Sequence, residues 1–558
     1  MSTSMAVAAA DFDLPRSQKR NIRWMLYVGF VALTVAAVNG LGQALNYAGI
    51  DILDWFPGMQ TYYQGLTAHG VLMALVLTFA FANAFLALMT ARALARPLPG
   101  LLLAGATWTF ILGTGLAGFA IVSGRASVLY TFYAPLKAHW TFYLGAALLV
   151  ISTWLLSAAL FTALVRWRRE NPGERIPLLA YISVLTFAMW DIASLGLAIE
   201  VVVFLLPWSL GLWEAIDPLL TRTLFWFSGH AIVYFWLLPA YVSWYALIPR
   251  QNGGKLFSDG ITRIVFLMFL LLSIPVGFHH QYTDPGIPAW QKAVHGFLTF
   301  GVFFPSLVTA FSVMAALENG GRARGGRGLL GWIPKLSWGD PAVSAQLLAM
   351  LVFLLGGITG LMNASYSMNQ VVHNTTFIPG HFHMTVGTAV ALTIMGVSYW
   401  LVPWLTGRQL VGRRIALAQG WVYTIGVLVL ARGLIQGGLE GMPRRSAVVA
   451  SSYMGEVPGW HWAGQIAGIG GVIMFVGIAM FAVVIAATIL FGKRTGEQEI
   501  PVSETILPPA RSGWEVRLDD LRLYVFLAIL LILIAYGPFA VGYLPPKMTA
   551  PGFGPPFF

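Results

Sequence analysis

The stretch Gly380-His381-Phe382-His383 opens a long apolar run in the last third of the chain. Two histidines two positions apart on an α-helix point about 200° apart, so they lie on opposite sides of that helix. A metal-binding side chain on each face of a membrane-buried helix is costly unless each one has a partner. One helix placed between two flat metal cofactors, with an axial ligand for each, would satisfy both histidines. The stretch therefore predicts a membrane helix that serves two cofactors.

The composition is that of an integral membrane protein. The 558 residues are 58% hydrophobic and 10% charged, whereas soluble domains carry about 25% charged residues. Apolar runs of about 20 residues or more predict an all-α membrane bundle and not a barrel. The net charge of +11 does not indicate nucleic-acid binding, because the basic residues form short clusters between apolar runs. The absence of cysteine excludes disulfides, iron–sulfur clusters and thiolate copper sites from this chain.

Thirteen apolar runs predict one transmembrane bundle over residues 24–543, between a tail at 1–23 and a tail at 544–558. The runs lie at roughly 24–44, 64–91, 101–123, 139–165, 177–206, 222–247, 262–281, 290–317, 343–365, 379–405, 415–438, 461–491 and 521–543. The first 23 residues lack the order of charges, apolar core and cleavage site of a signal peptide. With an inner N-terminus, most of the 33 lysines and arginines fall on the inner side. We expect a multi-pass protein of a bacterial or archaeal cytoplasmic membrane, with a cytoplasmic N-terminus and an outer C-terminal tail.

Six of the ten histidines come out at a similar depth, in the outer part of the membrane, when they are placed on these alternating runs. They are His69, His230, His279, His280, His381 and His383. A lone histidine near the end of a span is most often interfacial, and this is our interpretation of His139 and His461. Six histidines at one depth instead indicate a metal-binding region.

Imidazole is a good ligand for copper and for haem iron, so the six histidines could form three groups. His230, His279 and His280 suit a copper ion with an open position. His69 and His383 suit the axial pair of a six-coordinate haem, and His381 would hold a second haem that is open toward the copper. An open metal beside an open metal is where a small diatomic molecule would bind. Tyr234 lies four residues after His230, on the same helix face.

Three segments, together with His69, closely resemble subunit I of the haem–copper oxygen reductases. They are Gly229-His230-Ala231-Ile232-Val233-Tyr234, Phe278-His279-His280 and Pro379-Gly380-His381-Phe382-His383. The resemblance implies that His69 and His383 bind a low-spin haem, expected to be b-type, and that His381 binds a high-spin haem, expected to be a-type. It also implies one copper ion on the three remaining histidines, and a covalent bond between Tyr234 and His230. In the reduction of dioxygen to water the two metals can supply three electrons, and the Tyr234 phenol can supply the fourth electron and a proton.

The variant positions favour the B-type branch of these enzymes. The largest branch has Pro and Glu where this chain has Ala231 and Ile232. Nitric oxide reductases share the six histidines but have iron instead of copper and a glutamate where Tyr234 stands, so the tyrosine argues for oxygen. A quinol oxidase would differ mainly in its partner subunit. A secondary transporter with structural histidines is the rival from another class, and it predicts no haem bands in the purified chain.

Two polar stripes lead from Tyr234 toward the cytoplasm. Tyr241 and Tyr245 continue one helix face, and a second stripe recurs every three residues at Ser306, Thr309 and Ser312. Each hydroxyl alone is as well explained by a bond to its own helix. In the B-type oxidases the matching positions form the proton-input path, with Ser258 near its start and a threonine at the position of Ser312.

Haem propionates would require cations on the outer side. Arg444 and Arg445 lie in an outer loop, where positive charge is otherwise scarce, and arginine pairs with carboxylates in a bidentate manner. His373 matches a family position near the propionates on the proton-exit side. Four residues earlier this chain has Asn369 where an aspartate is common, so the resemblance does not specify the proton-exit route.

The sequence thus predicts the catalytic subunit of a proton-translocating cytochrome c oxidase. We expect electrons from cytochrome c through a subunit II with a dinuclear copper centre, because that centre needs thiolates that this chain lacks. A small extra subunit and the lipid bilayer are the other expected partners.

Overall fold

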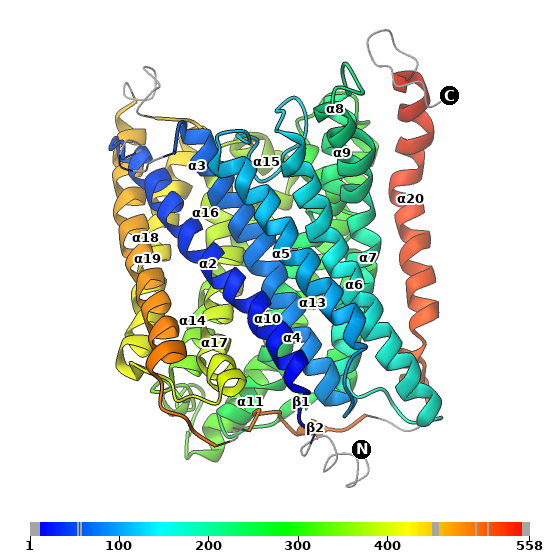
Figure 1. Cartoon of the computed structure of the whole chain (residues 1–558), viewed down its shortest axis with the longest axis vertical. Coiled ribbons are helices and arrows are strands. Elements are labelled where there is room, and N and C mark those ends of the chain that lie inside the picture. The colour runs from blue at the N-terminus through cyan, green and yellow to red at the C-terminus, as the bar shows by residue number, and fades with distance from the viewer. Residues whose placement is uncertain are drawn as a thin grey trace.

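The computed structural model describes residues 12–548 except 53–54, 56–57, 449–456, 497–498 and 510–512. These residues form a bundle of long helices that run nearly along one axis (Figure 1). Among the described residues, twelve helices are long and apolar enough to cross a membrane. Parts of the predicted tails at 1–23 and 544–558 lie outside the described residues, but the first helix already begins at Arg16 and the last continues to Met548.

Several spans consist of more than one helical segment. The first five are α2 (Arg16–Tyr47), α3–η2–α4 (Tyr62–Val71, Leu72–Leu77, Thr78–Ala93), α5 (Gly100–Val122), α6 (Trp140–Glu170) and α7–η3–α8 (Leu178–Ile199, Glu200–Leu205, Leu206–Ser209). The next four are α9–α10 (Pro218–Gly229, Ala231–Ala246), α13 (Ala289–Ala323), α14 (Pro341–Ala364) and α16–η6–α17 (Phe377–Met384, Thr385–Val390, Ala391–Thr406). The last three are α18 (Arg413–Leu439), α19 (Pro458–Phe491) and α20 (Leu521–Met548). The π-helical segments η2, η3 and η6 each interrupt a span.

The thirteenth predicted span, 262–281, is not a continuous helix. It is divided into α12 (Asp259–Leu272) and a 3-10 turn, η4 (Gly277–Gln281). A helix of 14 residues is only about 21 Å long, against a hydrocarbon core of about 30 Å. Pro275 explains the interruption, because proline lacks an N–H and disfavours helical backbone at the residue before it. The start of α2 and the end of α20 nevertheless lie at opposite ends of the bundle (Figure 1), so the segment carrying α12 and η4 also crosses.

The two ends of the bundle differ in their short elements. At the end where α2 begins, β1 (Leu256–Ser258) pairs in parallel with β2 (Thr505–Leu507), close to the short helix α11 (Ile248–Gln251). We call this the strand end. At the opposite end, α15 (Tyr366–Val372) lies near the start of α3, and we call this the α15 end. Near the strand end, buried Arg263 pairs with Asp259 at 2.5 Å and with Asp519 at 2.8 Å, which ties the segment before α20 to the bundle.

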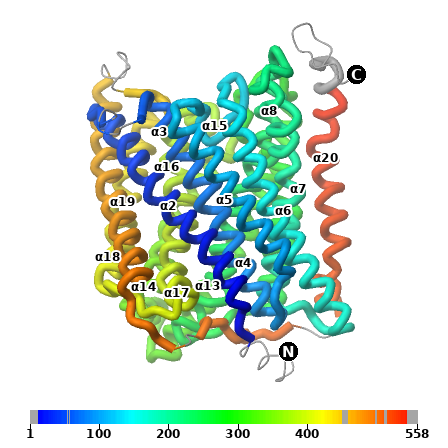
Figure 2. Tube along the Cα trace, in the orientation of Figure 1, coloured from blue at the N-terminus to red at the C-terminus, as the bar shows by residue number. Residues whose placement is uncertain are grey.

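The core lies along the inner helices. α4 and α10 are almost wholly buried, whereas α20 stands at the edge of the bundle, as Figures 1 and 2 show. α20 packs against α12 and α13. The interior helices therefore surround the region in which the predicted histidines lie.

Candidate active site

One continuous cavity of about 670 Å³ reaches all six predicted histidines. His69, His381 and His383 line it from α3 and α16, while His230, His279 and His280 line it from the α9–α10 junction and η4. The cavity extends to Arg444 and His373 near the α15 end. The structure thus brings together the six side chains that were predicted to lie at one depth in the membrane.

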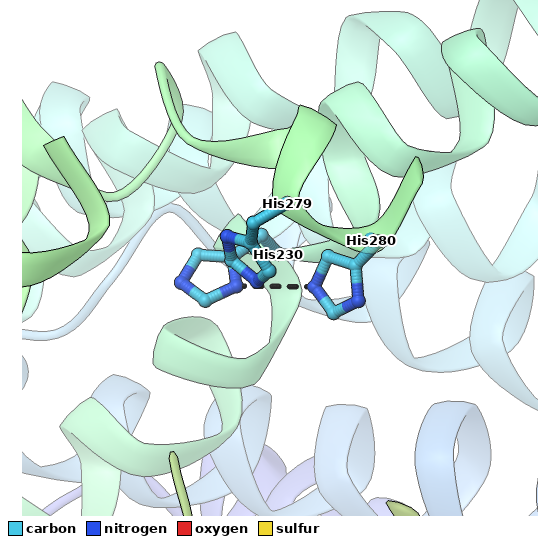
Figure 3. A group of neighbouring side chains, drawn as sticks. All are labelled: His230, His279 and His280. Carbon is cyan, nitrogen blue, oxygen red and sulfur yellow. Dashed lines mark hydrogen bonds between the residues drawn. The ribbon is translucent and has the colours of Figure 1, made fainter. Parts of the chain in front are cut away.

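His230, His279 and His280 form a compact group (Figure 3). Each residue offers one ligand nitrogen, and these nitrogens lie within 4.8 Å of one another. His230 Nδ1 and His280 Nε2 are 3.2 Å apart. Among the described residues this is the group of His, Asp or Glu side chains whose geometry could hold a metal ion. Two of its imidazoles are buried and that of His280 is half-buried, and three imidazoles suit copper or another transition metal.

Hydrogen bonds fix the ring nitrogen that His279 presents to the cavity. The Thr299 hydroxyl donates to the His295 carbonyl oxygen at 2.6 Å, so its oxygen accepts from His279 Nδ1–H at 2.9 Å. Nε2 of His279 is then unprotonated and available to a metal, as is typical of ligating histidines held by a neighbouring acceptor. The Trp226 ring stacks on His280, with centroids 4.0 Å apart and planes at 9°.

His69 and His383 face each other across the cavity. Their ring centroids are 6.2 Å apart and their planes are inclined by only 13°. His69 Nδ1 lies 2.9 Å from the Ala36 carbonyl oxygen, and His383 Nδ1 lies 2.6 Å from the Pro379 carbonyl oxygen. Both contacts require Nδ1–H, which leaves Nε2 of each ring free, and the separation leaves room for one metal ion with metal–imidazole bonds of about 2 Å.

His381 is oriented in the same way on another side of α16. The Thr359 hydroxyl donates to the Gly356 carbonyl oxygen at 2.8 Å, and its oxygen accepts from His381 Nδ1–H at 2.9 Å. Nε2 of His381 is therefore also free. A π-helical segment, η6, begins two residues after His383, and η2 begins three residues after His69; such segments frequently occur at functional sites.

Tyr234 lies beside the three-histidine group. Its hydroxyl is 3.4 Å from His230 Nε2, and its ring packs against Phe269. Further along α10, Tyr241 Oη donates to Ser306 Oγ at 3.3 Å, and Tyr245 Oη donates to Thr309 Oγ1 at 3.0 Å. The two predicted polar stripes therefore meet as hydroxyl pairs between α10 and α13.

The remaining residues of the predicted route lie nearer the strand end. Ser312 is buried beside Tyr245, although its hydroxyl oxygen has no well-formed hydrogen bond among the described residues. Ser258 ends β1 and caps α12, because its Oγ accepts from the Ile261 N–H at 3.3 Å. Ser258 thus has a structural role in addition to any role in proton uptake.

A group of cationic side chains lines the cavity at the α15 end. Arg444 donates through Nη2 to Asn374 Oδ1 at 3.0 Å, but Arg444 Nε and Arg445 Nη2 are buried without partners among the described residues. Burial, and then repulsion from Arg445, lowers the pKa of Arg444 to about 10. Burial and the cations Arg444, Arg222 and Arg445 lower the pKa of His373 to about 4. His373 Nδ1 lies 3.0 Å from Asn369 Oδ1.

This cluster suits an anionic ligand. Burial would raise the pKa of the nearby Tyr133 phenol, but the same three arginines outweigh burial and lower it. Buried guanidinium nitrogens without partners fit carboxylate groups. Together with the free Nε2 atoms, they fit haems whose propionates point toward the α15 end.

No local sequence pattern indicates several of the residues that shape this site. Thr299 and Thr359 orient His279 and His381. The Arg222–Asp284 ion pair of 2.9 Å joins α9 to the loop after η4. A threonine in an apolar span usually bonds its own helix, and both threonines also do so. Only the tertiary packing shows that their oxygens accept from histidines.

Comparison with known proteins gives a consistent result. Residues 20–473 match the family described as cytochrome c and quinol oxidase polypeptide I. The chain is 44% identical over 546 residues to a cytochrome c oxidase subunit 1 of Thermus thermophilus, which covers 95% of this chain and 96% of that protein. It is 27% identical to a probable quinol oxidase subunit 1 of Staphylococcus haemolyticus, over 76% of this chain and 63% of that protein.

A solved structure of a haem–copper terminal oxidase dimer has the same fold. The TM-score is 0.89 at 36% identity, over 93% of this chain and 92% of that chain. The predicted membrane bundle and the predicted oxygen-reducing catalytic subunit are thereby confirmed. The chain belongs to the cytochrome c and quinol oxidase polypeptide I family, and it is the catalytic, oxygen-reducing subunit of a membrane-bound cytochrome c oxidase.

Proposed function

We propose that this subunit belongs to the B-type branch and that its six histidines divide as two, one and three. His69 and His383 hold a b-type low-spin haem, and His381 holds an a-type high-spin haem. His230, His279 and His280 hold one copper ion. The observation that carries the division is the geometry of the rings. Those of His69 and His383 face each other with centroids 6.2 Å apart, and the ligand nitrogens of His230, His279 and His280 lie within 4.8 Å of one another, which leaves His381 for the third site.

Tyr234 is the residue that completes the oxygen chemistry. When bound, the haem iron and copper supply electrons and open coordination positions for dioxygen. The Tyr234 hydroxyl, 3.4 Å from His230 Nε2, is placed to give up a proton and an electron beside that position. Its ring is held by Phe269, so the phenol stays oriented toward the site.

Protons reach Tyr234 along the hydroxyl pairs between α10 and α13. Tyr245–Thr309 and Tyr241–Ser306 are within hydrogen-bond reach, and water molecules between the pairs would complete the route. Ser312 and Ser258 extend it toward the strand end. Each hydroxyl both donates and accepts, so a proton taken up at one side can be released at the other.

Arg444, Arg445 and His373 bind the haem propionates. The two arginines have buried nitrogens without partners, and a carboxylate would offset the repulsion between them. Asn369 accepts from His373 and holds this imidazole toward the same region.

The orientation and partners follow from the charge distribution and the missing cysteines. The strand end, where α2 begins, faces the cytoplasm, and the end of α20 lies on the outer side. Electrons arrive on the outer side from cytochrome c through a subunit II that carries a dinuclear copper centre. Protons taken from the inside and electrons from the outside charge the membrane, and proton pumping adds to this.

A reduced-minus-oxidised spectrum combined with metal analysis tests the assignment. We expect two spectroscopically distinct haems and one copper ion per polypeptide in the purified oxidase. Iron in place of copper at the second metal, with nitric oxide turnover faster than oxygen turnover, would contradict it. Electrons from reduced cytochrome c should drive turnover faster than electrons from a quinol.

A further inference from the structure

The turn that carries His279 and His280 lies inside the bundle but outside any long helix. Between Leu272, which ends α12, and Gly277, which begins η4, the backbone is not helical. Ile274 and Gly277 are fully buried there. Their backbone groups need hydrogen-bond partners, because an unpaired N–H or C=O in an apolar interior costs as much as a lost hydrogen bond.

Tyr536 of α20 supplies these partners. Its hydroxyl accepts from the Gly277 N–H at 3.1 Å and donates to the Ile274 carbonyl oxygen at 3.2 Å. One phenol therefore bridges both sides of the turn. A Cβ at Gly277 would overlap this hydroxyl and the Trp226 carbonyl oxygen, so the close approach requires glycine.

His295 of α13 links the turn to the same helix by a second set of hydrogen bonds, and we call the Tyr536 and His295 contacts the two braces. Its Nδ1 accepts from the Phe278 N–H at 3.3 Å, and its Nε2–H donates to the Ala535 carbonyl oxygen at 3.1 Å. The His295 carbonyl oxygen accepts from the Thr299 hydroxyl that orients His279. The buried imidazole thus connects the backbone of the turn, the orienting threonine and α20.

Apolar contacts support the two braces. The Phe278 ring packs against Tyr536 and Phe539, each with centroids 5.1 Å apart, and against His295 at 4.3 Å. α20 stands at the edge of the bundle (Figure 1), and the family match ends at residue 473, well before it. A segment outside the matched family region therefore contacts the turn that carries two of the three copper ligands.

We propose that α20 positions the copper-ligand turn, with Tyr536 and His295 as positioning residues that fix His279 and His280. This inference rests on the proposed function in that it takes the three histidines to bind copper. Loss of the Tyr536 hydroxyl leaves the buried Gly277 N–H unpaired and removes one of the two hydrogen bonds to the Ile274 carbonyl oxygen, which also accepts from the Val276 N–H at 2.7 Å. The turn therefore loosens while the ring of residue 536 still fills its place.

Tyr536→Phe is the first test, with Tyr524→Phe as the matched control on the same helix. In the purified oxidase, we expect the chelator concentration that removes half of the copper to fall about tenfold for Tyr536→Phe, the lower end of the range for groups that orient metal ligands. The infrared band of carbon monoxide bound to the reduced copper should broaden or shift. The low-spin haem spectrum should not change, and Tyr524→Phe should match the unmodified enzyme in all three measurements.

His295 gives an independent pair of variants. His295→Leu removes both hydrogen bonds and should also weaken copper retention. His295→Gln keeps an acceptor for the Phe278 N–H and a donor for the Ala535 carbonyl oxygen, so it should restore most of the retention. Failure of the glutamine to differ from the leucine would count against a positioning role.

Hydrogen exchange separates this inference from the assignment of the metal. Peptides covering residues 273–282 should exchange faster in Tyr536→Phe than in Tyr524→Phe, with or without copper. If the unmodified enzyme contains no copper and the two variants still differ in exchange, the proposed metal is contradicted while the positioning role of Tyr536 is supported. Unchanged exchange together with unchanged copper retention would overturn the proposal.

Discussion

The imidazole planes of His69 and His383 are inclined by 13°, with ring centroids 6.2 Å apart. Near-parallel rings whose Nδ1–H groups are both bonded to backbone carbonyl oxygens can share one metal ion between their Nε2 atoms. His383→Ala should therefore remove the low-spin haem signal first, because one axial ligand is lost while His381 is retained. A reduced-minus-oxidised spectrum of the purified variant measures this. Loss confined to the high-spin haem would reverse the assignment of the two histidines on α16.

Tyr234→Phe separates the oxygen chemistry from cofactor binding. The substitution removes a hydroxyl that lies 3.4 Å from His230 Nε2 but keeps the ring that packs against Phe269. Both haem spectra should stay nearly intact, while turnover should fall by about 100-fold or more, as is typical for loss of a proton-transfer group. Oxygen consumption with reduced cytochrome c is the measurement. Near-normal consumption would refute the role given to this tyrosine.

Most of the fold could be predicted from the sequence, because each membrane span is a continuous run of mostly apolar residues. The span at 262–281 was the exception. Its composition is apolar throughout, but Pro275 ends helical backbone near Ile274, and the chain continues as the turn η4. That interruption lets His279 and His280 approach His230, which a continuous helix would not allow for two adjacent side chains.

The residues of the site could be predicted from the common depth of six histidines and from the family resemblance, but the orientation of their side chains could not. Depth follows from position along a span, so His69 and His383 could be placed at one level without knowing their neighbours. The acceptors that fix their tautomers, such as the Ala36 carbonyl oxygen, lie on other helices. Those contacts depend on helix rotation and packing, which apolar runs do not specify, because almost any face of such a helix is hydrophobic.

Arg444→Gln should lower the midpoint potential of at least one haem by tens of millivolts. A nearby positive charge disfavours the oxidised, more positive haem, so removing it stabilises that form. The lowered pKa of Arg444, caused by burial and then by Arg445, indicates that the guanidinium is poorly screened. Redox titration measures the change, and Arg432→Gln, at an exposed position on α18, is the control. Identical potentials in the two variants would contradict a place for Arg444 beside the propionates.

The hydroxyl pair of Tyr245 and Thr309, 3.0 Å apart, should limit proton uptake when either member is lost. Thr309→Val keeps the shape of the side chain but removes the acceptor, so turnover should fall by about 10-fold or more, and the defect should grow as the pH rises because protons become scarcer. Thr309→Ser should recover most of the rate. Ser243→Ala is the matched control, since Ser243 is buried on the same helix as Tyr245 but bonds Gln346. Equal rates for Thr309→Val and Ser243→Ala across the pH range would place proton uptake elsewhere in the bundle.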